Sequence, residues 1–163
     1  MAGRVALPIA CLAAALLSGC IGGATEKSGS VGDKLEAKRV EVTVERIDRR
    51  TPTPRRDITG LSLPSRGYKL VGVLAYVCSG YGAAIGQQQF ELESSAGPGR
   101  PKYTARNYRN GFETVRDECE RGWMVWEIPA DSSPTKVRFS FDETGNSRDQ
   151  ADNLEARFEW DVE

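Results

Sequence analysis

Residues 68–78, with the sequence YKLVGVLAYVC, decide the fold of this chain. Apolar side chains occupy both sets of alternate positions between Leu70 and Val77. A strand that is covered on one face alternates apolar and polar residues, whereas a strand covered on both faces is apolar throughout. We therefore expect residues 68–78 to form the central strand of a sheet that is covered on both sides.

Outward from this segment, shorter stretches alternate apolar and polar residues with the period of two that indicates half-buried strands. The clearest begins at Leu154 and ends at Val162, and strands are also expected over 40–44, 87–93, 123–128 and 137–141. Ile47 breaks the alternation of its segment by one position, which suits a β-bulge. No stretch shows a sustained helical period. The sequence therefore predicts an all-β, immunoglobulin-like sandwich of two antiparallel sheets.

The first twenty residues resemble the signal of a bacterial lipoprotein. A short positive region, Met1–Arg4, precedes an apolar run, and LLSGC over 16–20 ends the run as a lipobox does. The run is shorter than the roughly 20 residues of a membrane-spanning helix. The resemblance implies export, cleavage before Cys20 and a lipid anchor on its thiol, where two or more acyl chains such as palmitate hold stably. A plain signal peptide with a chance cysteine and an uncleaved anchor are the alternatives.

Three regions follow from this interpretation. We expect a signal peptide over 1–19, a lipidated N-terminus and flexible linker over 20–38, and the sandwich domain over 39–163. Glycine, serine and charged residues dominate the linker, which cannot bury enough apolar surface to order itself. Removal of Arg4 lowers Lys plus Arg from 22 to 21 against 23 acidic residues, so the mature net charge is −2. The chain therefore lacks the excess of positive charge that is typical of nucleic-acid-binding proteins, and we expect no nucleic-acid partner.

The positions of the four cysteines in the chain indicate different roles for them. Cys11 lies within the signal peptide and Cys20 would carry the lipid, which leaves Cys78 and Cys119 as a pair in an exported protein, where disulfides persist. Closing this loop stabilises a fold by about 4 kcal/mol in the chain-entropy description. A metal site is the rival interpretation, but it needs further ligands, and the chain has no histidine and no third free cysteine. We predict a disulfide, no metal site and no cofactor.

From Tyr68 to Phe141 the order of features resembles a family of bacterial secreted antigens and lipoproteins whose domain has unknown function. The features are the long apolar strand from Tyr68, then FEL over 90–92 before a Gly-rich turn and Tyr103, then Gly122 before WEIP over 126–129, and KVRF over 136–139. The family's usual strand-ending asparagine is missing, and Cys78 stands near its place. The resemblance implies a telokin-like, immunoglobulin-like sandwich on the outer face of the membrane, and it brings no catalytic residue.

One segment is a candidate for binding an anionic partner. Its basic and aromatic residues are Arg100, Lys102, Tyr103, Arg106, Tyr108 and Arg109. A second basic run, RRTPTPRR over 49–56, adds four arginines. Guanidinium groups bind phosphate and carboxylate, so cell-surface polymers, lipid head groups or an acidic face of an envelope protein would fit. The alternative is a solvated loop that is neutralised by acidic residues over 113–120. The sequence leaves open whether the two basic segments share one end of the sandwich.

The absence of histidine excludes enzymes that need a histidine base, and a Cys78–Cys119 disulfide would exclude a cysteine nucleophile. We expect a lipid-anchored, extracytoplasmic binding module of the cell membrane without catalytic activity, which works through loops at one end of the sandwich. One alternative is a small envelope hydrolase that uses two carboxylates, although no spacing singles out a pair. The other is a structural accessory subunit that docks on an envelope protein by an edge strand.

Overall fold

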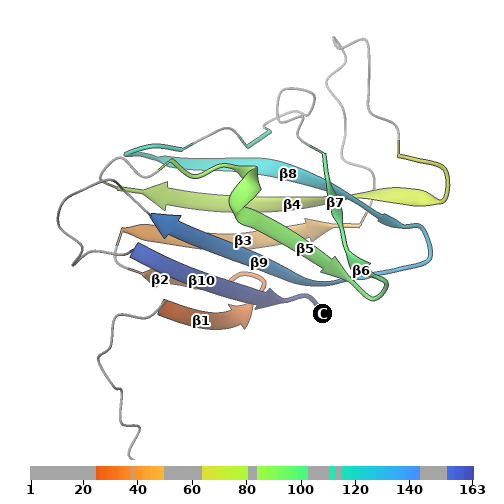
Figure 1. The fold of residues 1–163 in the computed structure, drawn as a ribbon, viewed down its shortest axis with the longest axis horizontal. Helices are drawn as coiled ribbons and strands as arrows, with labels where there is room; N and C mark the ends of the chain where they lie inside the picture. The colour runs from red at the N-terminus through yellow and green to blue at the C-terminus, as the bar shows by residue number, and fades with distance from the viewer. Residues whose placement is uncertain are drawn as a thin grey trace, which may run out of the picture.

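The chain forms two five-stranded sheets packed face to face (Figure 1). The structure is a computed structural model that describes residues 25–37, 39–49, 64–80, 84–102, 111–112, 115–143 and 154–163. The elements are β1 (Thr25–Ser30), β2 (Lys34–Ala37), β3 (Val40–Asp48), β4 (Tyr68–Ser79), the 3₁₀ turn η1 (Gln87–Gln89), β5 (Phe90–Ser94), β6 (Gly97–Pro98), β7 (Arg100–Pro101), β8 (Cys119–Pro129), β9 (Pro134–Glu143) and β10 (Leu154–Asp161). Sheet A has the order β1-β10-β9-β5-β6, and sheet B has the order β2-β3-β4-β8-β7. The predicted all-β sandwich is confirmed.

Strand β4 is the central strand of sheet B, as expected from its sequence. It pairs with β3 on one side and with β8 on the other, in a register that runs from Tyr68 opposite Pro129 to Cys78 opposite Cys119. Every residue over 70–75 is buried. The register between β3 and β4 shifts between Val44 and Arg46, which confirms the predicted bulge.

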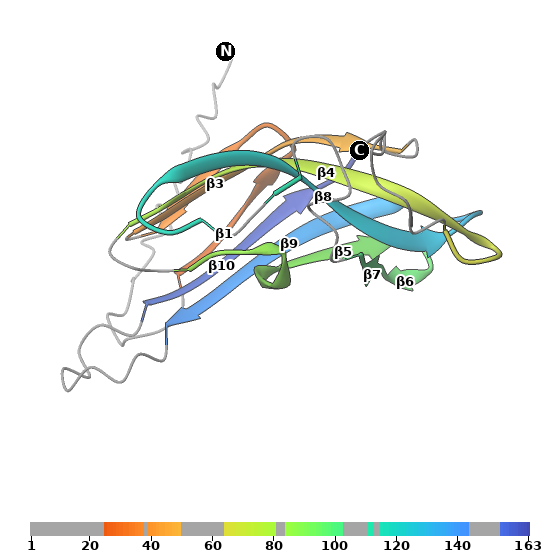
Figure 2. The same cartoon turned by 90° about the horizontal axis from the view of Figure 1, so that it is seen from above.

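The core lies between the inner faces of the two sheets, which Figure 2 shows from above as two layers. Sheet A contributes a row of aromatic side chains. The rings of Phe139 and Phe158 are stacked with their centres 5.5 Å apart, and the Trp160 ring lies edge-on to Phe158 with a centre-to-centre distance of 6.0 Å. Trp126 from sheet B is 1% exposed. Each large apolar side chain that is fully buried contributes about 1.5–3 kcal/mol, so this row is a main source of stability.

The linker expected over 20–38 is wrong for the described part of that range, because β1 and β2 occupy it. Strand β1 pairs in parallel with β10 and extends sheet A, and β2 pairs with β3 and extends sheet B. The polar composition of residues 20–38 suggested a linker. An edge strand can nevertheless be polar, because it gains backbone hydrogen bonds while its side chains stay in water. The turn between β1 and β2 is fixed by Trp160, whose indole N–H donates to the Asp33 carbonyl at 2.9 Å. The β1–β10 pair also departs from the expected all-antiparallel arrangement.

The antiparallel registers give the sandwich two distinct ends. Strand β1 begins at one of them, together with Val40, Ser79 and Cys119, and we call this the N-terminal end (at the left in Figure 1). Strand β3 finishes at the opposite end, where Tyr68 begins β4 and Pro129 finishes β8, and we call this the far end. The chain also finishes there, next to the label C in Figure 1.

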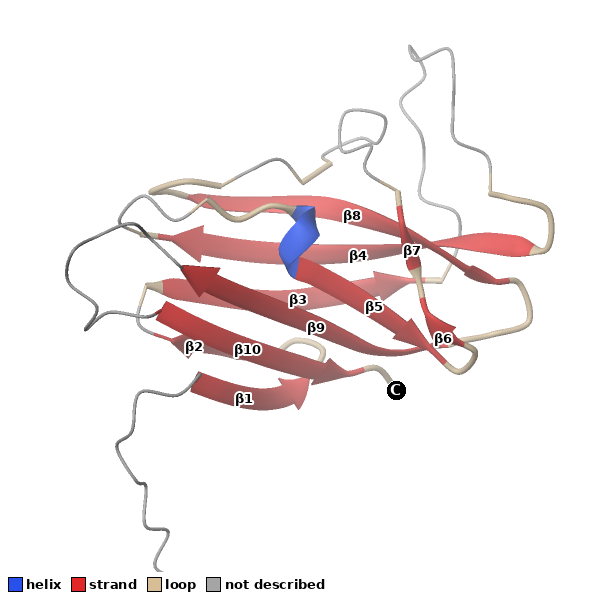
Figure 3. Cartoon of the chain, in the orientation of Figure 1, coloured by secondary structure: helices blue, strands red, loops and turns tan. Residues whose placement is uncertain are grey.

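Helical structure is limited to η1 in the part of the chain that the structure describes (Figure 3). None of the described residues belongs to a helix with the length and apolar character needed to cross a membrane. The predicted signal peptide and Cys20 lie outside the described residues.

Candidate functional site

Glu127 is a buried acidic residue on the outer face of sheet B, close to the far end. Its neighbours Trp126 and Ile128 belong to the core, so the alternation along β8 turns Glu127 to the other face. Its carboxylate accepts a hydrogen bond from the backbone N–H of Ser65 at 2.7 Å and another from the Ser65 hydroxyl at 3.2 Å. The ammonium group of Lys102 lies 2.9 Å from the same carboxylate. The buried charge therefore has both a counter-ion and hydrogen-bond donors, as burial of a charge requires.

The pKa of Glu127 lies below its ordinary value of 4.5. Burial alone would raise this pKa, because it takes water away from the charged form. The hydrogen bond from Lys102, the N–H of Ser65 and the positive charge of Lys102 favour the charged form and outweigh burial. Glu127 is therefore a carboxylate at neutral pH. Its side chain is 2% exposed, against 25% for Lys102, so the pair reaches water only through the lysine.

The backbone beside Glu127 fixes Lys102 in place. The amide N–H of Lys102 donates to the carbonyl of Val125 at 2.8 Å, and the side-chain amide of Gln87 donates to the same oxygen at 2.9 Å. Val125 and Leu70 are buried together on this outer face, at 1% and 2% exposed. The site is thus built on a rigid, partly apolar surface of sheet B.

Arg100 is held above an aromatic ring at the same end. Its guanidinium carbon lies 4.6 Å from the centre of the Tyr68 ring, and β7 places Arg100 opposite Glu127 in β8. Arg100 and Arg66 are both exposed, and neither makes an ion pair with an acidic residue among those described. A cation–π contact positions a guanidinium group and leaves its N–H donors available. Two cations at the far end can therefore meet an external anion.

Described residues of both basic segments lie at the far end, because Arg49 directly follows β3 and Arg100 lies in β7 opposite Glu127. Glu127 binds Lys102 of the candidate segment, and it also binds Ser65, which lies shortly before β4. The expectation that Lys102 faces a partner is corrected, because its charge is already paired with a buried carboxylate. Arg49 is the described member of the first run, and it donates to the main-chain carbonyl of Glu163. Four candidate residues lie outside the described residues, namely Tyr103, Arg106, Tyr108 and Arg109.

Sequence reasoning missed Glu127 itself. The signal was present, because Glu127 is the single charged residue in the apolar run from Trp123 to Ile128. An acidic residue in such a run needs a buried partner. The partners are 25 and 62 positions away in the chain, so the sequence could indicate the need for partners without identifying them.

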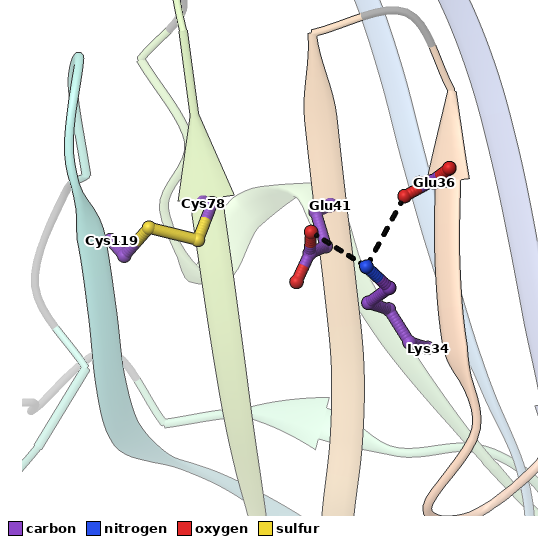
Figure 4. The surroundings of a disulfide bond; sticks show 5 residues. All are labelled: Lys34, Glu36, Glu41, Cys78 and Cys119. Atoms are coloured by element: carbon purple, nitrogen blue, oxygen red, sulfur yellow. Dashed lines mark hydrogen bonds and ion pairs between the residues drawn. A yellow bond between two sulfur atoms is a disulfide. The ribbon is translucent and has the colours of Figure 1, made fainter.

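The predicted disulfide is present at the N-terminal end, at the opposite end of β8 from Glu127. Cys78 and Cys119 face each other across β4 and β8 with an S–S distance of 2.05 Å. Figure 4 shows Glu41 on the strand next to Cys78, and beyond it the ammonium group of Lys34, which lies 3.1 Å from Glu41 and 3.3 Å from Glu36. No group of three metal-ligating side chains is found within the described residues.

A second charged surface covers the outer face of sheet A. Glu159 on β10 accepts hydrogen bonds from Lys136 and Arg138 on β9, and Arg138 also donates a hydrogen bond to Glu93 on β5. The hydrogen bond from Lys136 outweighs burial and lowers the pKa of Glu159, with Arg138 acting in the same direction. A groove of about 400 Å³ is lined by Arg138 and Glu159 of this network, together with Glu26 and Arg157. Because its charges largely pair with each other, this surface is a weaker candidate for binding an anion than the far end.

Comparison with known proteins identifies the fold and no family. No protein-family model matches the chain, and no curated protein matches it in sequence. Among solved structures, MPT63, a secreted protein of Mycobacterium tuberculosis, superimposes with a TM-score of 0.51 and 16% identity, covering 86% of this chain and all of that one. YcdA, a candidate lipoprotein of Bacillus subtilis, gives a TM-score of 0.52 and 9% identity over 80% of this chain, which spans 38% of the YcdA chain. At these identities the similarity extends to the sandwich fold alone.

Proposed function

We propose that this protein is an exported, lipid-anchored binding module of the cell membrane, and that it binds an anionic partner through the far end of its sandwich. The observation that carries the proposal is the centre at Glu127. By binding both Ser65 and Lys102, Glu127 joins the residues before β4 to the basic segment that begins at Arg100, at one end of the sandwich. Loops on a rigid scaffold are the usual place for binding residues.

The chemistry of the exposed cations indicates the class of partner. Arg66 and Arg100 present guanidinium groups at this end, and Tyr68 holds Arg100 in place. Guanidinium groups bind phosphate and carboxylate with two parallel hydrogen bonds. An anionic cell-surface polymer fits this chemistry, as does the acidic face of an envelope protein.

Two features support export. Residues 1–20 have the zones of a lipoprotein signal, with Cys20 as the residue that carries the lipid. The Cys78–Cys119 disulfide suits an oxidising compartment outside the cytoplasm. An intact-mass measurement of the protein from its native membrane tests both features. A mass that begins at Cys20 with added acyl chains is the expected result, and a mass that retains residues 1–19 would contradict the proposal.

The proposal includes no catalytic activity. A carboxyl that works as a general acid needs a raised pKa. Glu127 and Glu159 are the carboxyls with shifted pKa among the described residues, and both shifts are downward. Their cations keep both groups charged, which suits a structural role for each of them.

A binding experiment tests the partner class directly. Long-chain polyphosphate is titrated against the purified full chain in detergent, at low and at physiological salt. We expect binding that weakens with salt, and a loss of affinity of about fivefold when Arg66 and Arg100 are both changed to alanine. Arg116→Ala is the matched control, because it removes an exposed cation from the N-terminal end. Equal affinity for the double variant and the wild type would refute the far end as the binding surface.

A further inference from the structure

We infer that the N-terminal end of the sandwich is the surface that lies against the bilayer, and that the far end is directed away from it. This inference rests on the proposed function, because it takes the lipid on Cys20 as given. It identifies a second interaction surface, whose partner is the membrane that holds the anchor. It also deepens the proposed function, since the anionic partner would then lie above the bilayer and not among its head groups.

The connection between the anchor and the folded domain is short. Strand β1 begins at Thr25, so only residues 21–24 separate it from Cys20. Five Cα-to-Cα steps span at most about 18 Å even in a fully extended chain. The flexible linker expected from the sequence would have allowed the domain to lie much farther away and in any orientation. With only four connecting residues, the start of β1 stays close to the lipid.

Strand β1 is too well integrated to act as part of the linker. It pairs with β10 in a register that runs from Thr25 opposite Ala156 to Ser30 opposite Asp161. The amide of Ser30 donates to the Asp33 carboxylate at 2.8 Å, which fixes the turn that follows. The indole of Trp160 donates to the carbonyl of the same aspartate. Detaching β1 to lengthen the connection would break its ladder with β10 and loosen this turn.

The length of the strands separates the two ends. Strand β8 has 11 residues, and at about 3.3 Å per residue it covers roughly 35 Å from Cys119 to Pro129. The start of β1 therefore stays within about 18 Å of the bilayer, whereas the far end ranges up to roughly 55 Å from it. Averaged over all tilts, the N-terminal end is the closer of the two.

Energy transfer to the bilayer measures this difference. The lipidated chain is reconstituted into vesicles that carry an acceptor dye on their lipids. A donor dye is attached to a single introduced cysteine at either end of β8, by Arg116→Cys at the N-terminal end or Ala130→Cys at the far end. Both positions are exposed, and the native cysteines are occupied by the lipid and the disulfide. We expect transfer from position 116 to be at least about twofold more efficient. Equal or reversed efficiencies would overturn the inference.

Two controls separate this inference from the proposed function. Intact mass and vesicle flotation are recorded first, and a chain without acyl mass that does not float would refute both the anchor and the orientation. A chain that floats but gives equal transfer from both positions refutes the orientation alone. Insertion of about twenty glycine and serine residues between positions 24 and 25 should bring the two efficiencies closer together, because the domain is then released from the surface. Unchanged efficiencies in this variant would show that the short connection does not set the orientation.

Discussion

Nζ of Lys102 lies 2.9 Å from a carboxylate oxygen of Glu127, a residue that is almost fully buried on the outer face of a sheet. The outer face of a sandwich is normally solvated, so a buried ion pair there marks a place where further chain covers the strand. In this protein the pair joins the basic segment that begins at Arg100 to a strand that also binds Ser65, which lies shortly before β4. The carboxylate of Glu127 therefore holds two separate segments of the chain together at the far end.

Removal of Lys102 should destabilise the protein more than neutralisation of Glu127. In Lys102→Ala the buried carboxylate loses its counter-ion, and we expect a loss of about 2–4 kcal/mol in the free energy of unfolding. Glu127→Gln retains an oxygen that accepts the Ser65 N–H, and it should cost less. Urea denaturation of the two single variants and of the double variant measures these effects. The double variant should be more stable than Lys102→Ala, because no buried charge remains. A double variant whose losses simply add would argue against the pair.

Stability should fall on acidification because of Glu127 and Glu159. Both have a lower pKa in the folded chain than the ordinary value of 4.5. Their contribution is complete above about pH 4.5 and is lost as the pH falls toward the lower native pKa, because the unfolded chain binds protons first. Urea midpoints measured between pH 7 and pH 3 should show this loss. Glu127→Gln should have a shallower acid slope than the wild type, and an identical slope would exclude Glu127 as a contributor.

A chain that begins at Arg39 should be much less stable than a chain that begins at Ile21. The shorter chain lacks β1 and β2, so β10 and β3 become edge strands and the indole of Trp160 loses its acceptor on Asp33. Thermal unfolding followed by circular dichroism compares the two chains. We expect a markedly lower Tm and aggregation of the shorter chain, because newly exposed strand edges pair with other molecules. Equal Tm values would restore the domain boundary that the sequence suggested.

Gly122→Ala should loosen the segment that packs beside β8. A methyl group at position 122 would lie 2.5 Å from the Cα of Phe112 and 2.7 Å from its nitrogen, and backbone atoms cannot turn away as a side chain can. Phe112 would have to move, although its amide donates to the Trp123 carbonyl at 2.8 Å and its ring is buried. We expect a loss of about 1–3 kcal/mol in the free energy of unfolding. Gly97→Ala is a useful comparison, since its cost comes from a φ of 106° and not from a contact.

Much of the sandwich could be predicted because its pattern is local. In β10 the alternate residues Ala156, Phe158 and Trp160 are buried, as the period of two requires. The pairing of Cys78 with Cys119 followed from counting the thiols available in an exported chain, and the structure places both at the same end of β4 and β8. These inferences need no knowledge of which segments meet in space.

The remaining features depend on contacts between distant segments. The residues of β1, TEKSGS, carry no apolar pattern, and they form a strand because β10 offers an unpaired edge. The role of Glu127 depends on Ser65 and Lys102, and neither has a sequence signal that indicates a buried partner. Local composition described both places correctly as polar, but it could not show what lies beside them.

The parallel pairing of β1 with β10 joins the beginning of the folded chain to its last strand. In an exported protein the beginning crosses the membrane first, so β1 has no partner until β10 has also crossed. Completion of sheet A then draws β1 into the sandwich, so the first strand of the described chain is among the last to find its place.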